Sequence, residues 1–406
     1  MLIQHLQSKL DAIAALSLTR SLRVAESGTA PRQFVRGADG KARELLMFCS
    51  NDYLGLAAHP RLARAIAEGA EVYGAGSGAS HLISGHSVAH QRLDETLAAW
   101  FAPYIPGARA LSFCTGYMAN LAVLTALGDE SAEIFSESLN HASLIDGARL
   151  ARAEVKRYAH GDVAQLRALL AASNAKIKLI VTDAVFSMDG DLAPLPALLA
   201  LAKEFDAWLV VDDAHGFGVL GARGRGALEH FDLHSERLIL IGTLGKAAGL
   251  SGAFVAAHPT VIDYLTQAAR TFIFTTASPP AIAHALLTSL DLIENETGIS
   301  RREKLRRLQT GLRAGIRKIL ADNPALGWIL PPSETPIQPL IVGDSAVVMK
   351  LSALLEQEGL RVPGIRPPTV AVGTARLRIT LCATHKPADI DRLLEALAAA
   401  VKELRA

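Results

Sequence analysis

Two segments of the sequence place reactive side chains directly after apolar runs that are expected to be buried strands. Asp212, Asp213 and His215 end the segment WLVVDDAH, and Lys246 follows the apolar run LILIG. Ligands of α/β sheets bind beyond the carboxyl ends of the strands, so both segments are candidate parts of one site. Two acids and a histidine at a strand end are costly to bury unless each of them is paired.

The residues alone leave three interpretations of the segment WLVVDDAH open. The aspartates can cap a turn after the strand, which is a common use of Asp. Asp212, Asp213 and His215 can also ligate a metal ion, but no further His or Asp follows at a diagnostic spacing, and no metal is predicted. In the third interpretation, Asp212 ionises and pairs with the protonated ring nitrogen of a cofactor.

The surroundings of several familiar motifs argue against the functions that these motifs usually indicate. The stretch GFGVLG (216–221) matches a dinucleotide-binding pattern, but Gly- and Arg-rich residues 222–226 follow it where that pattern requires an apolar helix. Lys246 does not belong to a P-loop, because Leu240 and Ala247 stand where Gly and Ser or Thr are required. The sequence has no G-x-S-x-G or H-E-x-x-H motif, which disfavours α/β-hydrolases and zinc peptidases of that type.

Lys246 has two remaining interpretations, a solvated surface lysine and a buried nucleophile. Most lysines are at the surface, but the flanking Gly245 allows the backbone to approach a ligand, and a desolvated lysine forms Schiff bases. The segment Thr115-Gly116-Tyr117, between an expected strand and helix, can cradle a phosphate with its backbone N–H groups. A lysine for the aldehyde, an acid for the ring nitrogen and a phosphate cradle together predict a pyridoxal 5'-phosphate site.

The elements that must position these residues alternate between strand and helix. Continuous apolar runs are typical of strands that helices cover on both faces. The pattern predicts an α/β domain over residues 49–290 with a mostly parallel central sheet. Strands are expected at Ala110–Phe113, Ile177–Thr182, Trp208–Asp213, Leu238–Gly242 and Ala253–Ala256, and helices at Tyr117–Leu127 and Leu195–Phe205.

The two ends of the chain differ in pattern from this middle part. Residues 1–48 are expected to form a separate N-terminal segment, in which an amphipathic helix with Leu2, Leu6, Leu10 and Ile13 on one face precedes the Gly- and charge-rich stretch Gly37–Arg43. Residues 291–406 are predicted to form a smaller C-terminal α+β domain. Its expected elements are a basic helix at 301–320, strands at Ile337–Val342 and Ala375–Leu381, and a helix at Asp389–Leu404.

Composition limits the classes of partner. The 406 residues include 41 basic and 40 acidic ones, so no nucleic-acid partner is predicted from charge. Cys49, Cys114 and Cys382 form no C-x-x-C pair, which fits a reducing compartment. No apolar run approaches the roughly 20 residues of a membrane span, and the first residues do not resemble a signal peptide. A cytoplasmic protein without a membrane partner is therefore expected.

Six ordered segments resemble the α-oxoamine synthases, a family of fold type I pyridoxal-phosphate enzymes. These enzymes condense an amino acid with an acyl thioester and release CO2. The resemblance runs from about residue 45 to the end and implies the predicted α/β fold, bound pyridoxal phosphate and a homodimer. The segments are SNDYLG (50–55), GSGAS (76–80), FSMDGD (186–191), DDAHGFGVLG (212–221), GTLGKA (242–247) and GTARLRITL (373–381).

The resemblance also implies a substrate pair. Ile337–Asp344 and Ile365–Leu381 are most similar to the branch of the family that joins L-alanine to a pimeloyl thioester, carried by CoA or an acyl carrier protein, in biotin synthesis. Branches that make aminolevulinate, 2-amino-3-oxobutyrate or serine-derived ketones share the earlier motifs and remain the alternative. A non-catalytic dimeric binding protein on the same fold is a further alternative, against which the intact Lys246, Asp212 and His215 argue.

Roles for the cofactor residues follow from the matching motifs. The resemblance implies that Lys246 holds the cofactor as a Schiff base and later moves the α-proton of the substrate. It implies that Asp212 pairs with the ring nitrogen, that His215 bonds the phenolic oxygen, and that His141 stacks on the ring, with Ser187 beside it. A lone histidine such as His141 is more often structural when taken without the other motifs.

Phosphate and substrate contacts are implied in the same way. Gly116 and Tyr117, helped by Thr243, would cradle the phosphate, and Thr275 or Thr276 would reach a phosphate across the dimer interface. The implied substrate residues are His141, Asn51 near the reacting carbonyl, Thr369 in the acyl site, and Arg20 or Arg23 from the N-terminal segment. Arg376 or Arg378 would hold the amino-acid carboxylate, and Arg376 stands at the closer motif position.

The basic helix at 301–320 carries eight basic residues and one acid, Glu303. Leu305, Leu308 and Leu312 are expected to face the core. A charge run of this kind is usually a solvated helix face. The sharper hypothesis is a docking surface for an acidic acyl carrier protein or for the phosphates of CoA, which includes Arg306 and Arg307.

Overall fold

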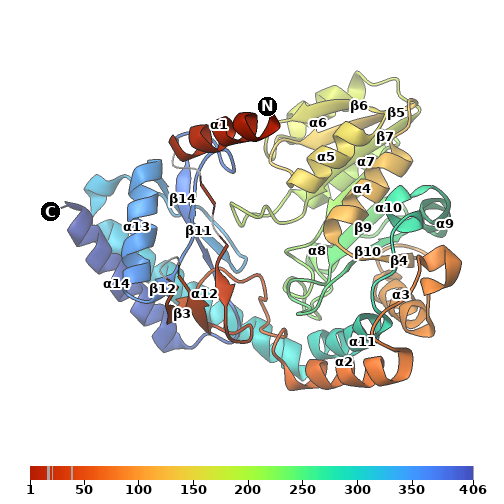
Figure 1. Ribbon diagram of the computed structural model, residues 1–406. Helices are drawn as coiled ribbons and strands as arrows, with labels where there is room; N and C mark the ends of the chain where they lie inside the picture. The colour runs from red at the N-terminus through yellow and green to blue at the C-terminus, as the bar shows by residue number, and fades with distance from the viewer. Residues whose placement is uncertain (16–18, 21, 38–39, 406) are drawn as a thin grey trace.

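The fold is taken from a computed structural model, which describes residues 1–15, 19–20, 22–37 and 40–405 (Figure 1). Positions 38 and 39 of the predicted Gly- and charge-rich stretch, and position 406 of the last predicted domain, lie outside the described residues. A central sheet with helices on both faces forms one part of the molecule, and a smaller part contains both ends of the chain (Figure 1).

The central sheet has seven strands in the order β4-β10-β9-β8-β7-β5-β6. All of them are parallel except β10, which runs antiparallel to both of its neighbours. This confirms the predicted, mostly parallel sheet. The strands are β4 (Arg109–Phe113), β5 (Ala132–Glu137), β6 (Glu154–Tyr158), β7 (Ile177–Asp183), β8 (Trp208–Asp212), β9 (Leu238–Thr243) and β10 (Ala253–Ala257).

Helices cover this sheet on both faces, which explains the continuous apolar runs. In β8, Leu209 and Val211 belong to one buried cluster and Val210 belongs to the other. The first face packs against α3 (Val88–Phe101), α6 (Val163–Ala171), α7 (Leu195–Glu204) and α11 (Pro280–Glu294). The second packs against α4 (Gly116–Leu127), α5 (Ala142–Leu150), α9 (Pro259–Ala268) and α10 (Arg270–Ile273). The remaining elements of this part are α2 (Pro60–Tyr73), the π-helix η1 (His81–Gly85) and α8 (Ala227–His230).

The N-terminal segment pairs with the C-terminal part of the chain. Strands β1 (Val24–Ala25), β2 (Arg32–Arg36) and β3 (Ala42–Met47) form a sheet that β12 (Leu360–Arg361) completes, with Leu46 opposite Leu360. Charged residues occupy many positions of β2 and β3, so their sequence did not indicate strands. The divisions proposed at residues 48/49 and 290/291 stay a prediction.

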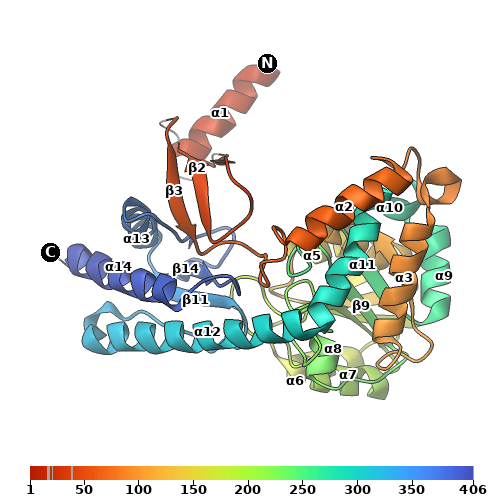
Figure 2. The same cartoon turned by 90° about the horizontal axis from the view of Figure 1, so that it is seen from below.

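The C-terminal part contains the predicted helices and strands. Helix α12 (Glu296–Asp322) runs from the end of α11 alongside α14 (Pro387–Arg405), as Figure 2 shows. A sheet of β11 (Ile337–Gly343), β14 (Ala375–Thr380) and β13 (Gly364–Ile365) packs beside α13 (Ser345–Gln357). The short 3-10 helix η2 (Pro324–Leu326) follows α12.

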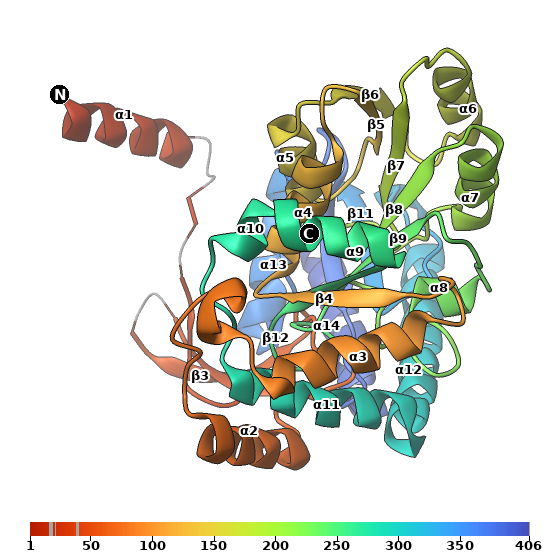
Figure 3. The ribbon, with the colours of Figure 1, turned by 90° about the vertical axis from the view of Figure 1, so that its right-hand side faces the viewer.

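Helix α1 (Leu2–Ala15) forms where it was predicted, but its apolar face is not covered. None of its residues is buried, and it stands apart from the rest of the chain (Figure 3). No helix among the described residues is long and apolar enough to span a bilayer.

Several basic side chains of helix α12 bond to backbone carbonyl oxygens of the protein and do not extend into solvent. Leu305, Leu308 and Leu312 are buried, as predicted. Arg302 is buried and donates to the carbonyl oxygens of Ile293 and Ala222, and Arg313 donates to that of Pro331. Arg301 likewise donates to the carbonyl oxygens of Leu54 and Gly55. The basic side chains left on the exposed face include Arg306, Arg307, Arg317 and Lys318.

Candidate active site

A pocket of about 200 Å³ lies at the carboxyl ends of the central strands. The loops after β4, β5, β7, β8 and β9 converge there, as the parallel arrangement requires. The structure thus brings together seven of the residues predicted from sequence. The pocket is lined by Gly116, Tyr117, His141, Asp212, His215, Thr243 and Lys246, together with Asn120, Ser143, Asp183 and Ala214.

Lys246 extends into this pocket from a tight turn after β9. The N–H of Gly249 donates to the carbonyl oxygen of Lys246 at 2.9 Å, and a Cβ on Gly249 would lie 2.6 Å from the backbone of Leu56 and Ala57. Burial lowers the pKa of Lys246 to about 8, although nearby Asp212 acts in the opposite direction. A substantial fraction of the amine is therefore neutral and nucleophilic near neutral pH.

His215 connects Lys246 to a buried tyrosine that the sequence interpretation did not include. Its Nε2 lies 2.9 Å from Lys246 Nζ, and its Nδ1 lies 2.5 Å from the hydroxyl of Tyr53. Burial, and next the charge of Lys246, hold the pKa of His215 well below its usual value, so the ring is neutral. Burial also raises the pKa of Tyr53 to about 12, so its hydroxyl stays protonated.

Asp212 is buried and accepts hydrogen bonds at both carboxylate oxygens. Asn120 donates from Nδ2 to Oδ2 at 2.7 Å, and the N–H of Ala214 donates to Oδ1 at 2.9 Å. The same Asn120 amide reaches the hydroxyl of Ser143 at 2.7 Å. Both carboxylate oxygens are thus held by N–H donors, which fixes the orientation in which Asp212 can face a ring nitrogen.

Asp213 contacts the start of α8 and does not line the pocket, so the two neighbouring aspartates have different roles. Its Oδ2 accepts the N–H of Ala227 at 2.8 Å, at the start of α8. A Cβ on Gly216 would lie 2.1 Å from its Oδ1, and one on Gly226 would lie 1.9 Å from its Oδ2. Gly216 of the GFGVLG stretch and Gly226 after it therefore leave room for a buried carboxylate, whose pKa burial raises well above its usual value.

His141 lies at the entrance of α5, where it is fixed from two sides. Its Nδ1 lies 2.7 Å from the hydroxyl of Ser143, and its backbone N–H donates to Asp183 Oδ2 at 2.6 Å. Burial lowers the pKa of His141, so the ring is neutral. Burial, and next the charge of Asp212, raise the pKa of Asp183 well above its usual value.

The start of α4 offers backbone donors to an anion. Thr115 caps the helix by accepting the N–H of Met118 at 3.2 Å, and Gly116 and Tyr117 follow as the first helical residues. The first N–H groups of a helix have no intrahelical partner and attract phosphates. Thr243 lies against Gly116, since a Cβ on Gly116 would be 3.7 Å from the Thr243 hydroxyl.

The donor set of the pocket fits pyridoxal phosphate. A partly neutral lysine, a doubly hydrogen-bonded carboxylate and a helix start that can hold a phosphate share one pocket. Neutral His141 offers a ring face against which the cofactor ring can stack. Neutral His215 offers a further hydrogen bond to the cofactor. Each chemical requirement of the cofactor thus has a candidate group on this chain.

Other predicted residues do not line this pocket. The carbonyl oxygen of Ser187 accepts from Arg378 Nε at 2.5 Å. Thr275 is half-buried and Thr276 is exposed, and the latter forms a β-bridge with Ser80. Thr369 and Arg20 are exposed, and Arg23 pairs with Glu356 at 2.5 Å. The roles of these six residues in binding stay predictions.

The two candidate arginines of β14 differ in their contacts. Arg376 is paired with Asp189 at 2.5 Å and is buried. Arg378 Nη2 lies 3.5 Å from Asn51 Oδ1, which in turn lies 3.3 Å from the Tyr53 hydroxyl. Arg378 is therefore connected to the pocket through Tyr53, whereas Arg376 is held by an acid of the FSMDGD segment.

Sequence reasoning missed Asn120, Ser143, Asp183 and Tyr53. Two of them gave a signal in hindsight: Asn120 is a polar residue inside the apolar stretch of α4, and Asp183 ends a buried strand as Asp212 does. Tyr53 lies within the SNDYLG segment, which was noted for Asn51, and Ser143 follows His141 by two residues. Their contacts depend on pairs distant in sequence, which composition and spacing do not reveal.

The fold and this pocket define a fold type I pyridoxal-phosphate enzyme, and comparisons with known proteins agree. The model of class I and II aminotransferases matches residues 43–397, so the chain belongs to that family. The 8-amino-7-oxononanoate synthase 2 of Polaromonas sp. (strain JS666) is 63% identical over 404 residues, which cover 100% of both chains. Within the family, the chain belongs to the 8-amino-7-oxononanoate synthases.

Solved structures show the same fold. A serine palmitoyltransferase with PLP has a TM-score of 0.88 at 28% identity and covers 99% of this chain and 98% of its own. The 8-amino-7-oxononanoate synthase of Francisella tularensis has a TM-score of 0.74 at 32% identity and covers 89% of this chain and 99% of its own. These likenesses confirm the predicted α-oxoamine synthase fold.

Proposed function

We propose that the protein condenses L-alanine with a pimeloyl thioester to give 8-amino-7-oxononanoate, CO2 and free thiol, a step of biotin synthesis in the cytoplasm. The observation that carries the proposal is Lys246 Nζ at 2.9 Å from His215, in one pocket with Asp212. Full-length identity of 63% to a curated 8-amino-7-oxononanoate synthase supports the choice of substrates. Pyridoxal phosphate, when bound, supplies the aldehyde and the electron-accepting ring for this chemistry.

Lys246 has two tasks in this proposal, to hold the cofactor and to move a proton. Its neutral amine, favoured by the lowered pKa, is the nucleophile for the aldehyde carbon. Once an amino acid displaces it, the free amine can take the α-proton of L-alanine. Neutral His215 beside it offers a hydrogen bond without a competing positive charge.

Asp212 keeps the ring nitrogen protonated in this proposal. Its two hydrogen bonds, from Asn120 and Ala214, hold the carboxylate in one orientation. A fixed, buried negative charge stabilises a developing positive charge more strongly than a solvated one does. His141, held by Ser143, would form one wall of the ring site.

We propose Arg378 for the substrate carboxylate, in place of Arg376, which the sequence interpretation favoured. Arg376 already pairs with Asp189, whereas Arg378 faces Asn51 and Tyr53. Asn51 would then lie near the reacting carbonyl. Thr369 remains the proposed contact of the acyl chain. One of Arg20 and Arg23 remains a proposed substrate contact, and Arg20 is the one without the Glu356 pairing.

The proposal includes a homodimer. Thr275 and Thr276 do not line the pocket of their own chain, so their proposed phosphate contact needs a second copy of the chain. The acyl donor is proposed to be pimeloyl-CoA or a pimeloyl acyl carrier protein. An acidic carrier would meet the exposed Arg306 and Arg307 of α12.

The deciding experiment compares amino acids at a fixed acyl donor. Purified protein loaded with pyridoxal phosphate would be mixed with pimeloyl-CoA and with L-alanine, glycine or L-serine, and CO2 and the amino ketone would be measured. Turnover with L-alanine supports the proposal. Turnover with glycine or L-serine alone would transfer the assignment to a related synthase, such as a serine palmitoyltransferase.

A further inference from the structure

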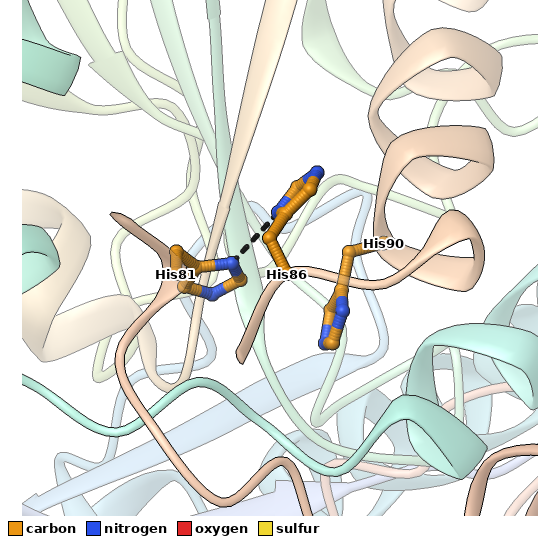
Figure 4. Close-up of side chains that lie close together, drawn as sticks. All are labelled: His81, His86 and His90. Carbon is orange, nitrogen blue, oxygen red and sulfur yellow. Dashed lines mark hydrogen bonds between the residues drawn. The ribbon is translucent and has the colours of Figure 1, made fainter. Parts of the chain in front are cut away.

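Three histidines outside the pocket lie next to one another where η1 leads into α3 (Figure 4). We refer to His81, His86 and His90 as the three-histidine cluster. One ring nitrogen of each lies within 4.8 Å of the other two, and the Nδ1 atoms of His81 and His86 are 2.9 Å apart. No metal site was predicted from the sequence, although His86 and His90 have the H-x3-H spacing of many metal ligands.

A tight backbone turn builds the contact between His81 and His86. The N–H of Gly85 donates to the carbonyl oxygen of Ser80 at 2.9 Å and closes the π-helical turn. A Cβ on Gly85 would lie only 2.1 Å from the carbonyl oxygen of Ala79. The turn therefore requires glycine, and such single π-turns frequently occur at functional sites. The two imidazoles are brought together by the fold rather than by chance rotamers.

His86 has the arrangement of a metal-binding histidine. Its Nε2 lies 3.4 Å from Gln91 Oε1, a carbonyl oxygen that can only accept, so the proton is placed on Nε2. Its Nδ1 then keeps a lone pair that faces His81. Metal-bound histidines typically donate their second ring N–H to a fixed acceptor in this way.

His81 and His90 are also oriented by their neighbours. His81 stacks on Phe272 at a centroid distance of 4.9 Å, and burial lowers its pKa to about 4, which leaves the ring neutral. His90 Nδ1 lies 3.0 Å from the hydroxyl of Ser87, and its Nε2 lies 2.9 Å from the carbonyl oxygen of Ser278. The N–H of Ser87 donates to the same Nδ1 at 3.1 Å, so the proton lies on Nε2, and Nδ1 has the lone pair that can bind an ion at the cost of the Ser87 contacts.

The cavity beside the cluster adds carboxylates. His81 and His86 line a space of about 420 Å³ together with Asp94 and Glu95. Asp94 is 9% exposed, and its Oδ1 has no hydrogen-bond partner among the described residues. Arg109, which also lines the cavity, is paired with Asp263. A bound cation with its water shell would give Asp94 the partner that it lacks.

We propose that the three-histidine cluster binds one divalent transition-metal ion of the Zn²⁺ type, with His81 and His86 as the ligands already in contact and His90 as the third. Imidazole nitrogens suit such ions. At Zn–N distances of about 2.0–2.1 Å, two nitrogens of a tetrahedral site lie roughly 3.3–3.4 Å apart. The 2.9 Å contact needs to open only slightly, and water would fill the fourth position near Asp94.

The test uses untagged protein, saturated with pyridoxal phosphate and freed of excess cofactor, titrated with Co²⁺ and followed by its visible absorption. We expect one ion per chain and competition by Zn²⁺. His86→Ala removes a direct ligand and should weaken binding at least about 100-fold, because even outer-shell partners contribute 10- to 100-fold. Zn²⁺ should also raise the Tm of the unmodified protein but not that of the variant.

His5→Ala is the matched control, because His5 is exposed on α1 and should leave the affinity unchanged. His86 is exposed as well, so its replacement should not unfold the chain. If circular dichroism shows otherwise, His81→Gln takes its place. The proposal is overturned if the protein binds no stoichiometric Co²⁺, or if both cluster variants bind it as tightly as the unmodified protein.

Discussion

Asn120 donates a hydrogen bond of 2.7 Å to Oδ2 of Asp212, from helix α4 to the end of strand β8. The bond links the helix whose start can hold a phosphate to the acid that can hold a ring nitrogen. One hydrogen bond thereby fixes the position of the phosphate-binding helix relative to the acid that can hold the ring nitrogen of the same cofactor. Several consequences of this geometry can be measured.

Asn120→Ala should weaken cofactor binding without unfolding the protein. Loss of a hydrogen bond to a charged group costs about 1.5–3 kcal/mol, which corresponds to roughly 10- to 100-fold in affinity. Titration of cofactor-free protein with pyridoxal phosphate, followed by absorbance, measures this change. Thr125→Ala on the same helix is the control, because Thr125 bonds only to the carbonyl oxygen of Leu121. Equal affinities for the two variants would refute the role of Asn120.

Tyr53→Phe should shift the pH dependence of cofactor capture. In the unmodified protein without cofactor, the capture rate should rise with pH through about 8, as Lys246 loses its proton. The Tyr53 hydroxyl, at 2.5 Å from His215 Nδ1, places the His215 proton on Nε2 and so favours the neutral amine. Without it, His215 can accept from a protonated Lys246, and the midpoint should move upward.

Stopped-flow absorbance at a series of pH values gives the midpoint of Tyr53→Phe. Tyr158→Phe is the matched control, since Tyr158 is a buried tyrosine at the end of β6, outside the pocket. An unchanged midpoint in Tyr53→Phe would show that Tyr53 does not set the protonation of His215 and Lys246.

His160→Gln should lower stability in a pH-dependent way. His160 contacts Glu137 Oε1 at 3.0 Å and Asp191 Oδ2 at 2.8 Å, and these two acids raise its pKa to about 10. A raised pKa means that the stabilisation is full below pH about 6.5 and is lost as the pH rises through about 10. Because the side chain is 35% exposed, we expect only about 1 kcal/mol at neutral pH.

Urea unfolding at neutral pH and near pH 10 measures the His160 contribution. The difference between the unmodified protein and His160→Gln should shrink toward zero at the higher pH. A difference that is constant across this range would mean that the contribution comes from packing against Phe186 and not from charge.

Reversal of charge at Arg306 and Arg307 should raise KM for a pimeloyl acyl carrier protein about tenfold and leave kcat unchanged. Both side chains are exposed on α12, whereas Arg302 is buried and Arg313 half-buried, so these two are not suitable targets. Charge complementarity mainly affects encounter rates and weakens with salt. Arg149→Glu with Arg152→Glu is the control pair. An unchanged KM for the carrier would refute docking on α12.

The sequence was most informative where burial leaves a continuous apolar run. Strands β8 and β9 were predicted within one residue, because helices cover both of their faces. Strands β5 and β6 were missed, since Glu133 and Glu154 interrupt their apolar pattern and β6 lies at the sheet edge. The antiparallel direction of β10 is set by pairing with β4 and β9, which no local pattern encodes.

The site residues divide in the same way, into those that a local motif predicts and those that only a contact between distant parts of the chain reveals. Lys246, Asp212 and His215 follow apolar strands and stand in recognisable motifs, so their convergence was predicted. Tyr53 and Asn120 act through single contacts to residues far along the chain, and these contacts exist only in the fold. Asp213 adjoins Asp212 in sequence, yet it bonds to the start of α8.

The most direct test of the account is to locate the lysine that holds the cofactor. Protein loaded with pyridoxal phosphate would be treated with borohydride, which fixes a lysine-bound cofactor permanently, and its peptides would be analysed by mass spectrometry. The account predicts one modified lysine, Lys246, and no fixed cofactor in Lys246→Ala. Modification of a different lysine, or equal labelling of the Lys246→Ala variant, would contradict it.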